Sequence, residues 1–380
     1  MQWIDLLIKN PLLFIPLLYI LAFVIQMVYY LGIYARVLFY REKEEISGLP
    51  PVSVIICAKN EADNLKKNLP AILQQEYPEA YEVIVVNDGS SDDSDMVLQR
   101  LQQNYRHLQT TEIKNDQKFT HAKKLAVTMG IKKAQYAWIL LTDADCVPSG
   151  KTWIRSMAKH FDDQTSLVLG YGGYKSYPGL LNTLIRFDTL TIALQYFTYS
   201  LAGFPYMGVG RNLAYRKKLF FDNKGFAGHY HLHSGDDDLF VNQTATRHNT
   251  RVQISHHATV YSEPHHNLSA WFRQKRRHLS TAYYYRKMTK LRLLTEIYSR
   301  VGFYLFFVLS LVYFKQYDLY ILGIFAFRWI LQWIVYKNLM NRLGEKIFLL
   351  PSVFYDMFLP FINFIALISN KIYSNNHRWR

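Results

Sequence analysis

Cysteine is nearly missing from this 380-residue chain, which contains only Cys57 and Cys146. Each stands inside or beside an apolar run, so we interpret both as buried, inert thiols of a protein in a reducing compartment. Internal repeats and low-complexity segments are missing as well. The sequence therefore predicts neither a disulfide framework nor a repeat architecture.

Acidic residues are also scarce, with 29 Asp and Glu against 44 Lys and Arg and a formal net charge of +15. Such an excess indicates an anionic partner, for which nucleic acid, anionic lipid and a sugar diphosphate all qualify. No RNA-binding signature is present, and the basic residues cluster beside apolar segments. We therefore predict contact with anionic lipid and no nucleic-acid partner.

Hydrophobic residues make up 50% of the chain and are concentrated in blocks. The first block, residues 12–34, is long enough to span a hydrocarbon core of ~30 Å and has no small-residue cleavage site, so it predicts a retained anchor. Arg36, Arg41 and Lys43 follow directly. By the positive-inside tendency, the next domain is expected in the cytoplasm, as in a bacterial-type inner membrane protein.

Three further span candidates lie near the C-terminus, at residues 298–314, 319–336 and 347–368. The last of them contains Asp356 and two prolines, which leaves a re-entrant or interfacial helix open as the alternative. We expect a transmembrane anchor over residues 1–46, a cytoplasmic catalytic domain over 47–290 and a transmembrane region over 291–380.

The middle of the chain alternates between strand and helix patterns. Unbroken apolar runs at residues 52–57, 81–87 and 136–142 predict strands buried on both faces, and residues 60–75, 94–105 and 122–134 predict helices between them. This βαβ repetition predicts an α/β domain with a Rossmann-like, mostly parallel sheet. The apolar segment 180–201 carries Arg186 and Asp188, so we favour a buried or interfacial helix over a span.

Polar residues end each predicted strand. Asn60 and Glu61 follow the first strand, Asp88 the second, and Asp143 and Asp145 the third. One such acid alone is more often a helix cap or a turn former, but ligands bind at the carboxyl ends of the strands in open α/β sheets. Three polar strand ends at one edge therefore predict a common binding site.

The D-x-D pattern of Asp143 and Asp145 predicts a divalent metal site. Two carboxylates across a tight turn suit a hard cation, Mg²⁺ or Mn²⁺, beside a diphosphate. Lys123 and Lys124 could add positive charge near those phosphates, and a solvated helix face is the equally weighted alternative. Histidine pairs farther along the chain leave zinc as a minor alternative.

These motifs resemble glycosyltransferase family 2. The resemblance rests on Val52-Ser53-Val54-Ile55-Ile56 running into Asn60-Glu61, on Val86-Asn87-Asp88-Gly89-Ser90 and on Asp143-Ala144-Asp145, and covers roughly residues 50–285. It implies a GT-A fold and an inverting reaction without a covalent intermediate. It also implies that Asn60, Glu61 and Asp88 contact the nucleotide-sugar donor and that Asp145 is the principal metal ligand.

Gly235-Asp236-Asp237-Asp238 resembles the E-D or D-D pair of that family. By this alignment Asp237 is the catalytic base, with Asp236 next in line, because an inverting displacement needs a group to take the acceptor proton. A solvated turn is the plainer interpretation of three adjacent acids.

Gln274-Lys275-Arg276-Arg277-His278 resembles the Q-x-x-R-W element of membrane-bound members. Gln274 and Arg277 match and are expected at the donor diphosphate, whereas His278 stands where tryptophan is expected. That departure weakens the alternative of a processive polysaccharide synthase. Trp271 is the substitute aromatic surface that we predict for the acceptor.

The loop Gly208-Val209-Gly210-Arg211-Asn212 resembles the segment before the base motif, so Gly210, Arg211 and Asn212 are expected at the acceptor site. The overall layout is similar to ceramide glucosyltransferases, which implies a lipid or lipid-linked acceptor, with a growing glycan also open. A UDP-sugar is favoured over a GDP-sugar as donor. Arg328 and Asp356 inside apolar segments leave a membrane transporter as the alternative of another class.

Overall fold

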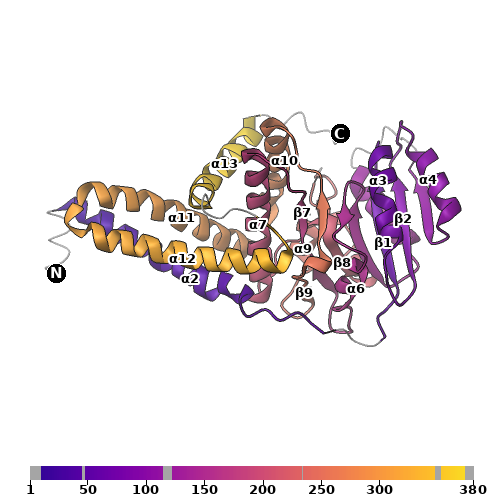
Figure 1. Ribbon diagram of the computed structural model, residues 1–380, viewed down its shortest axis with the longest axis horizontal. Coiled ribbons are helices and arrows are strands. Elements are labelled where there is room, and N and C mark those ends of the chain that lie inside the picture. Colours follow the sequence, from indigo (N-terminus) through magenta and orange to yellow (C-terminus); the bar gives the residue numbers. More distant parts are fainter. Residues whose placement is uncertain (1–9, 45–47, 114–121, 233, 347–351, 373–380) are drawn as a thin grey trace.

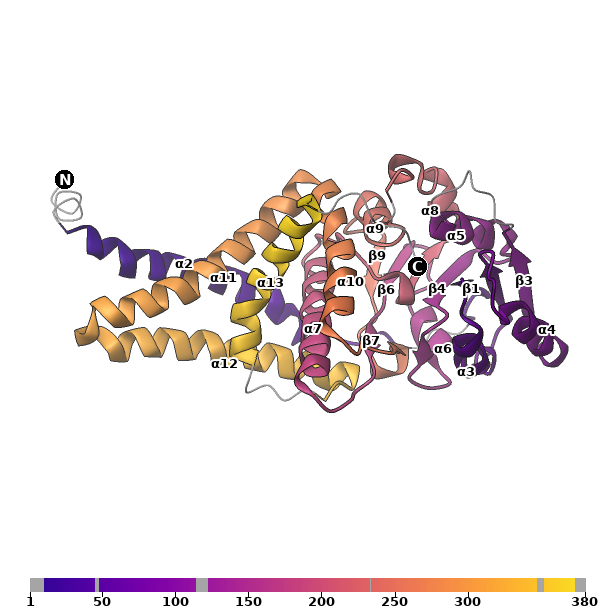
Figure 2. The same ribbon diagram turned by 90° about the horizontal axis from the view of Figure 1, so that it is seen from above.

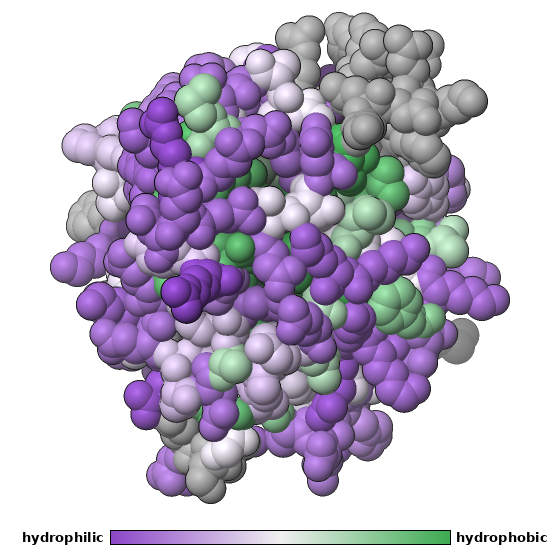
Figure 3. Space-filling model, turned by 90° about the vertical axis from the view of Figure 1, so that its right-hand side faces the viewer, coloured by the Kyte–Doolittle hydropathy of each residue, from purple (hydrophilic) through white to green (hydrophobic). Residues whose placement is uncertain are grey.

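The computed structural model describes residues 10–44, 48–113, 122–232, 234–346 and 352–372. An α/β domain occupies one end of the molecule and a bundle of long helices the other (Figure 1). The bundle is apolar, whereas the opposite end presents a mainly hydrophilic face (Figure 3).

A seven-stranded sheet forms the core of the α/β domain, in the order β3-β2-β1-β4-β8-β6-β9. The strands β1 to β4 run parallel to one another, and only β8 runs antiparallel to its neighbours. The strand bounds are β1 Val52–Ala58, β2 Tyr81–Asn87, β3 Leu108–Glu112, β4 Trp138–Asp143, β6 Leu167–Leu169, β8 Leu213–Arg216 and β9 Thr250–Val252. The predicted mostly parallel sheet is confirmed.

Helices cover both faces of this sheet, which explains why its strands read as unbroken apolar runs. The helices α3 (Ala62–Leu73) and α4 (Ser94–Asn104) pack against one face, where Val54 of β1 is buried. The helix α5 (Ala122–Lys133) packs against the other face, where Ile55 is buried. Successive residues of β1 thus point to opposite hydrophobic clusters.

The second half of the domain adds a small sheet, β5-β10-β7, and several shorter helices. Its strands are β5 Val147–Pro148, β7 Gly172–Tyr174 and β10 Val260–Ser262. The helices are α6 Trp153–Ala158, α8 Lys217–Asp222, α9 Asp238–Thr244, α10 Leu268–Thr281 and the 3₁₀ turn η3 Gly210–Asn212. These elements position the loops that face the carboxyl ends of β1, β2 and β4.

The segment with two internal charges forms α7 (Leu180–Leu201), a helix buried beside the sheet. Its charges are paired from distant parts of the chain: Asp188 accepts from Lys275 Nζ at 2.7 Å, and Arg186 donates to Glu345 at 2.5 Å. The helix is not among the four described helices that are long and apolar enough to cross a membrane. This agrees with the buried-helix interpretation.

The four span candidates are one N-terminal and three C-terminal helices, as predicted. They are α2 Phe14–Gly32, α11 Lys287–Tyr313, α12 Asp318–Leu343 and α13 Ser352–Ile372. In both ribbon views α13 runs across the direction of α2, α11 and α12, and it lies beside α10 and α7 (Figures 1 and 2). Its direction keeps an interfacial helix open as an alternative to a fourth span.

Ionisable residues inside the bundle pair with one another. Asp356 of α13 accepts from Arg300 of α11 and from Arg328 of α12, each at 2.9 Å. Arg300 also donates to Glu296 at 2.9 Å, and Arg328 donates to Gln26 of α2 at 2.8 Å. Paired charges of this kind hold helices together in an apolar environment, so the cluster has a structural explanation that requires no transport.

Candidate functional site

The ends of β1 and β2 are tied together by Asn60. Its backbone lies in the left-handed region, with φ of 55°, where asparagine is among the few tolerated side chains. Its backbone N donates to Ser90 Oγ at 2.9 Å, and its Oδ1 accepts from the backbone N of Ser91 at 2.8 Å. In the structure Asn60 therefore shapes the binding edge by joining two loops.

Asp88 and Glu61 lie at this edge with raised pKa values. Asp88 is only 4% exposed, and its Oδ2 has no hydrogen-bond partner among the described residues; Lys59 Nζ is 3.9 Å away. Burial raises the pKa of Asp88. Burial also raises the pKa of Glu61, with the charges of Asp145 and Asp143 adding to it against the hydrogen bond from Asn64. A buried carboxylate oxygen that accepts no hydrogen bond within the described residues is suited to accept one from a ligand.

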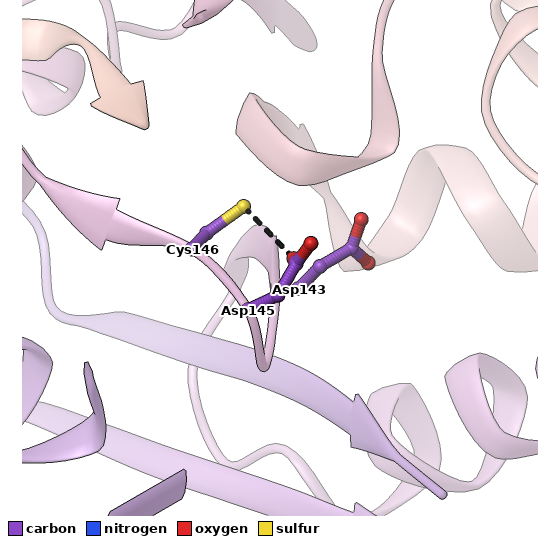
Figure 4. A group of neighbouring side chains, drawn as sticks. All are labelled: Asp143, Asp145 and Cys146. Carbon is purple, nitrogen blue, oxygen red and sulfur yellow. Dashed lines mark hydrogen bonds between the residues drawn. The ribbon is translucent and has the colours of Figure 1, made fainter. Parts of the chain in front are cut away.

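Asp143 ends β4, and Asp145 follows across the turn before β5 (Figure 4). Ligand atoms of Asp143, Asp145 and Cys146 lie within 4.8 Å of one another. Burial and the charge of Asp143 raise the pKa of Asp145. The two carboxylates fit Mg²⁺ or Mn²⁺, because a hard cation takes oxygen ligands and would relieve this repulsion. The fully buried Cys146 thiol instead donates to Asp145 Oδ1 at 3.5 Å.

Lys123 and Lys124, to which the sequence analysis assigned the same role, have different partners in the structure. Lys123 Nζ lies 3.2 Å from Asp143 Oδ1 and 3.6 Å from Asp236 Oδ2. Burial opposes its charge, yet these carboxylates raise the pKa of Lys123 well above its usual value. Lys124 is buried and donates to the carbonyls of His229 and Leu232 at 2.6 and 2.9 Å. In the structure Lys124 thus supports a loop, and neither lysine lies on a solvated face.

The three consecutive acids that follow Gly235 have three different environments. Burial alone would raise the pKa of Asp236, but the charge of Lys123 lowers it. Asp238 is the N-terminal residue of α9 and accepts from Thr281 Oγ1 and, at 2.7 Å, from Tyr285 OH. Asp238 thereby fastens α9 to the end of α10. The sequence motif alone contained no signal for this structural role.

Asp237 is the acid of this group that remains partly exposed with a raised pKa. Burial, followed by the charges of Asp236 and Asp238, raises the pKa of Asp237 to about 7. Its Oδ2 accepts from the backbone N of Gly210 at 2.7 Å, which orients the carboxylate. A carboxyl group that titrates near neutrality can act as a general base at physiological pH.

Gly210, Arg211 and Asn212 form η3, but they do not share one environment. Gly210 contacts Asp237 as described. Arg211 stacks over the Tyr174 ring at 4.4 Å and donates to Ser262 Oγ at 2.9 Å. Its charge acts on Asp145 and lowers the pKa of that carboxyl, against the stronger effect of burial. Gly210 and Arg211 thus connect the base motif to the predicted metal motif.

Asn212 and Trp271 do not take the positions that we predicted for acceptor-site residues. Asn212 is fully buried, donates to the carbonyls of Tyr171 and Ala258 and accepts from Trp153 Nε1. Trp271 is 3% exposed and packs from α10 against Tyr174 and Ile185 in a small cluster. Both side chains are enclosed by the protein, because buried polar groups require internal partners and a large aromatic ring fills the core.

The α10 residues of the Q-x-x-R element face different neighbours. Gln274 Oε1 accepts from Tyr174 OH at 3.1 Å, and the charge of Arg277 helps to lower the pKa of Asp236. His278 is exposed. Gln274 and Arg277 therefore lie beside Tyr174 and the acidic motif, respectively. Among the described residues, the one group of metal-ligating side chains contains no histidine, so the zinc alternative has no support there.

Comparison with known proteins agrees with the motifs. Residues 53–221 match the family model described as glycosyl transferase family 2. Glycosyltransferase AglE of Haloferax volcanii is 32% identical over 146 residues, covering 38% of this chain and 46% of that protein. Poly-beta-1,6-N-acetyl-D-glucosamine synthase of Staphylococcus epidermidis is 30% identical over 145 residues, covering 37% of this chain. The match spans a third of the synthase, 33%, so neither relative is matched over most of its length.

A solved structure matches over almost the whole chain. The mannosyltransferase PcManGT from Pyrobaculum calidifontis, in complex with GDP-Man and Mn²⁺, is similar with a TM-score of 0.60. The match covers 95% of this chain and 99% of that one, at 17% sequence identity. The likeness confirms the predicted GT-A fold with its associated helices.

Proposed function

We propose that this protein, whose residues 53–221 match the family model of glycosyl transferase family 2, is an inverting glycosyltransferase of the membrane surface. It transfers a sugar from a nucleoside diphosphate sugar to a hydroxyl group of a lipid or lipid-linked acceptor. The donor we favour is a UDP-sugar. GDP-sugars are the alternative, because GDP-Man is bound by the Pyrobaculum neighbour.

The observation that carries this proposal is the position of Lys123 between two acidic motifs. Its ammonium lies 3.2 Å from Asp143 and 3.6 Å from Asp236, residues that are far apart in sequence. The proposed metal site and the proposed base motif therefore face the same small volume. A sugar held there by its diphosphate at Asp143 and Asp145 would present its reacting carbon toward Asp237.

Each group has a distinct role in the proposed mechanism. Bound Mg²⁺ or Mn²⁺ would neutralise charge on the departing diphosphate. Asp88 and Glu61 would hold the nucleoside, and Lys123 and Arg277 would add positive charge near the phosphates. Asp237, oriented by Gly210, would take the proton of the acceptor as the new bond forms. No residue needs to form a covalent intermediate in this scheme.

We expect the rate of transfer to rise through about pH 7. The pKa of Asp237 is raised to about 7, so its basic form is lost as the pH falls below that value. The rate should then drop about tenfold per pH unit, as for any single required base. The measurement is initial rate against pH at saturating donor. A rate that stays level from pH 5 to pH 8 would contradict the assignment, and Asp236→Asn should move the acidic limb to lower pH.

The four helices that are long and apolar enough to cross a membrane support an acceptor at the membrane surface. Arg36 follows the first span candidate and lies on the side of the α/β domain, so the positive-inside tendency favours a cytoplasmic catalytic domain. A lipid-linked acceptor suits this layout, because its head group would sit at the height of the domain. A processive polysaccharide synthase is the second candidate, prompted by the Staphylococcus relative, and His278 in place of tryptophan weighs against it.

The experiment that tests the function is nucleoside diphosphate release by the detergent-purified protein. UDP- and GDP-sugars are offered with Mn²⁺ or Mg²⁺, with and without a lipid extract of the host membrane. We expect turnover with one donor that depends on the extract. Turnover without extract, with a lengthening glycan, would favour the synthase. Failure to bind any donor in the presence of metal would overturn the proposal and favour the transporter.

A further inference from the structure

A cavity of about 440 Å³ lies at the junction between the first span candidate and the α/β domain. It is lined by the turn after α2, by the C-terminal end of α7 and by β9. The turn is η2 (Tyr34–Val37), which continues directly from α2. The cavity thus belongs to the level at which an apolar span would leave the membrane.

This cavity is separate from the site described above. Asp143 ends β4 at the carboxyl edge of the sheet, whereas Thr250, which lines the cavity, begins β9. The strands β4 and β9 point the same way, because each is related to β8 through antiparallel pairing, β9 by way of the parallel strand β6. The whole of β9 lines the cavity, and β9 is the last strand of the sheet, separated from β4 by β8 and β6. Along α7, about 20 Å of helix separates Asp188, which meets α10, from Leu201 at the cavity.

Three arginines give the cavity its charge: Arg36, Arg247 and Arg251. No acidic side chain is among the described residues that line it, and no described carboxylate forms an ion pair with any of the three guanidinium groups. Two acids in segments next to the lining pair with lysines, Asp162 with Lys43 at 2.8 Å and Glu42 with Lys159 at 2.7 Å. The positive charge of the cavity is therefore not compensated by the described residues.

The three arginines differ in how firmly they are held. Arg36 donates to the carbonyls of Gly32 and Leu201, and Arg251 donates to those of His248 and Thr250. Arg247 makes no hydrogen bond to any described residue, and its side chain lies against Gly203. Two arginines are thus positioned by the backbone, while the third is available to close on a ligand.

Exposed apolar side chains stand next to the lining residues. Phe39 is 80% exposed and adjoins Tyr40, which lines the cavity; Phe204 is 41% exposed and adjoins Gly203. Leu31, at the end of α2, is also largely exposed. A cationic cavity beside exposed aromatic and aliphatic groups matches the two halves of a phospholipid, a phosphate-bearing head group and its acyl chains.

We propose that this cavity binds the head group of an anionic phospholipid and thereby docks the catalytic domain on the membrane. The inference rests on the membrane placement within the proposed function, but not on the glycosyl transfer itself. Arginine guanidinium groups bind phosphate with paired, charge-assisted hydrogen bonds. Because the cavity lies at the last strand, β9, and its lining shares no residue with the site around Asp237, its lipid would be a bound component and not the acceptor.

The test is retention of phosphatidylglycerol by the full chain in neutral detergent, measured by native mass spectrometry. The double substitution Arg247→Gln/Arg251→Gln should weaken lipid retention about 25-fold, because one basic residue near an anionic membrane surface usually strengthens binding about fivefold. The matched control is Arg100→Gln/Arg106→Gln, which removes the same charge from exposed positions outside the cavity. The control should retain the lipid like the wild type.

Several outcomes would overturn the inference. If the cavity variant retains as much phosphatidylglycerol as the wild type, the cavity is not a lipid site. If both double variants lose the lipid equally, the effect is one of overall charge and is not specific to the cavity. Displacement of the lipid by millimolar inorganic phosphate would identify a site for a free anion instead. If the double variant melts early, Arg247→Gln alone should still weaken retention about fivefold. Donor binding measured in parallel distinguishes failure of the proposed enzyme from failure of this site.

Discussion

Asp237→Asn is expected to lower the rate of glycosyl transfer by at least about a hundredfold, because positioned general bases contribute on the order of 10²–10⁴-fold. Asparagine has nearly the same shape and its amide oxygen can still accept from Gly210, but it cannot take a proton. Donor affinity should stay within about twofold of wild type, since the proposed donor site lies around Asp88 and Asp145. Turnover and donor binding are measured on the same preparation.

Two control substitutions make this result interpretable. Asp222→Asn removes an exposed carboxylate whose partner is Lys218, and it should leave the rate unchanged. Asp238→Asn removes an acid that accepts from Thr281 and Tyr285, so its main effect should be on stability. Wild-type turnover by Asp237→Asn would remove this residue from the mechanism and direct attention to Asp236.

Asp145→Ala should weaken metal-dependent donor binding by about a hundredfold or more. Loss of a residue that only supports a ligand costs roughly 10–100-fold in metal affinity, so loss of a direct ligand should cost at least the upper part of that range. The measurement is donor affinity as a function of Mn²⁺ concentration. Without metal, the variant should bind donor as well as wild type, because the substitution also removes a negative charge near the diphosphate.

Cys146→Ala is the matched control at the same turn. The thiol lies within 4.8 Å of both carboxylates, but a hard cation prefers oxygen ligands and the thiol is fully buried. We therefore expect Cys146→Ala to keep the Mn²⁺ dependence of the wild type. If donor binding by Asp145→Ala depends on Mn²⁺ as it does in the wild type, Asp145 is not a metal ligand. If Cys146→Ala loses the Mn²⁺ dependence, the Cys146 sulfur is one of the ligands.

Long-range pairing decided several features that had no local signal. The strand β3 reads Leu-Gln-Thr-Thr-Glu and has a single buried residue, so its pattern does not differ from that of a loop. It becomes a strand because it pairs with β2 at the edge of the sheet. Similarly, the charges of α7 are tolerated in a buried helix because Lys275 and Glu345 reach them from later segments.

Chemically similar neighbours received different roles for the same reason. Lys123 and Lys124 are adjacent, yet helical geometry turns one ammonium to Asp143 and Asp236 and the other to the carbonyls of a loop. Asp237 and Asp238 are likewise adjacent, but Asp237 meets Gly210 and Asp238 is held from α10. A motif identifies residue types, whereas the contacts that distinguish them come from elsewhere in the chain.

The cavity lined by the three arginines also depends on long-range contacts, because its lining comes from three segments that are far apart in the sequence. Arg36 was recognised from sequence only as part of a charge asymmetry after the first apolar block. Its pairing with Leu201, and the position of Arg247 beside Gly203, depend on how η2, α7 and β9 meet. Such a site cannot be predicted from local pattern.

The sequence by itself determined the parallel α/β domain, the apolar helices at both ends and the acidic strand ends. Each depends on local periodicity or on residues directly after a strand, and short-range patterns carry that information. Only the tertiary structure decided which acid remains partly exposed and titrates near neutrality, which lysine faces the acids, and that Asn212 and Trp271 are enclosed by the protein. Burial and charge proximity set these properties, and both arise from segments brought together by the fold.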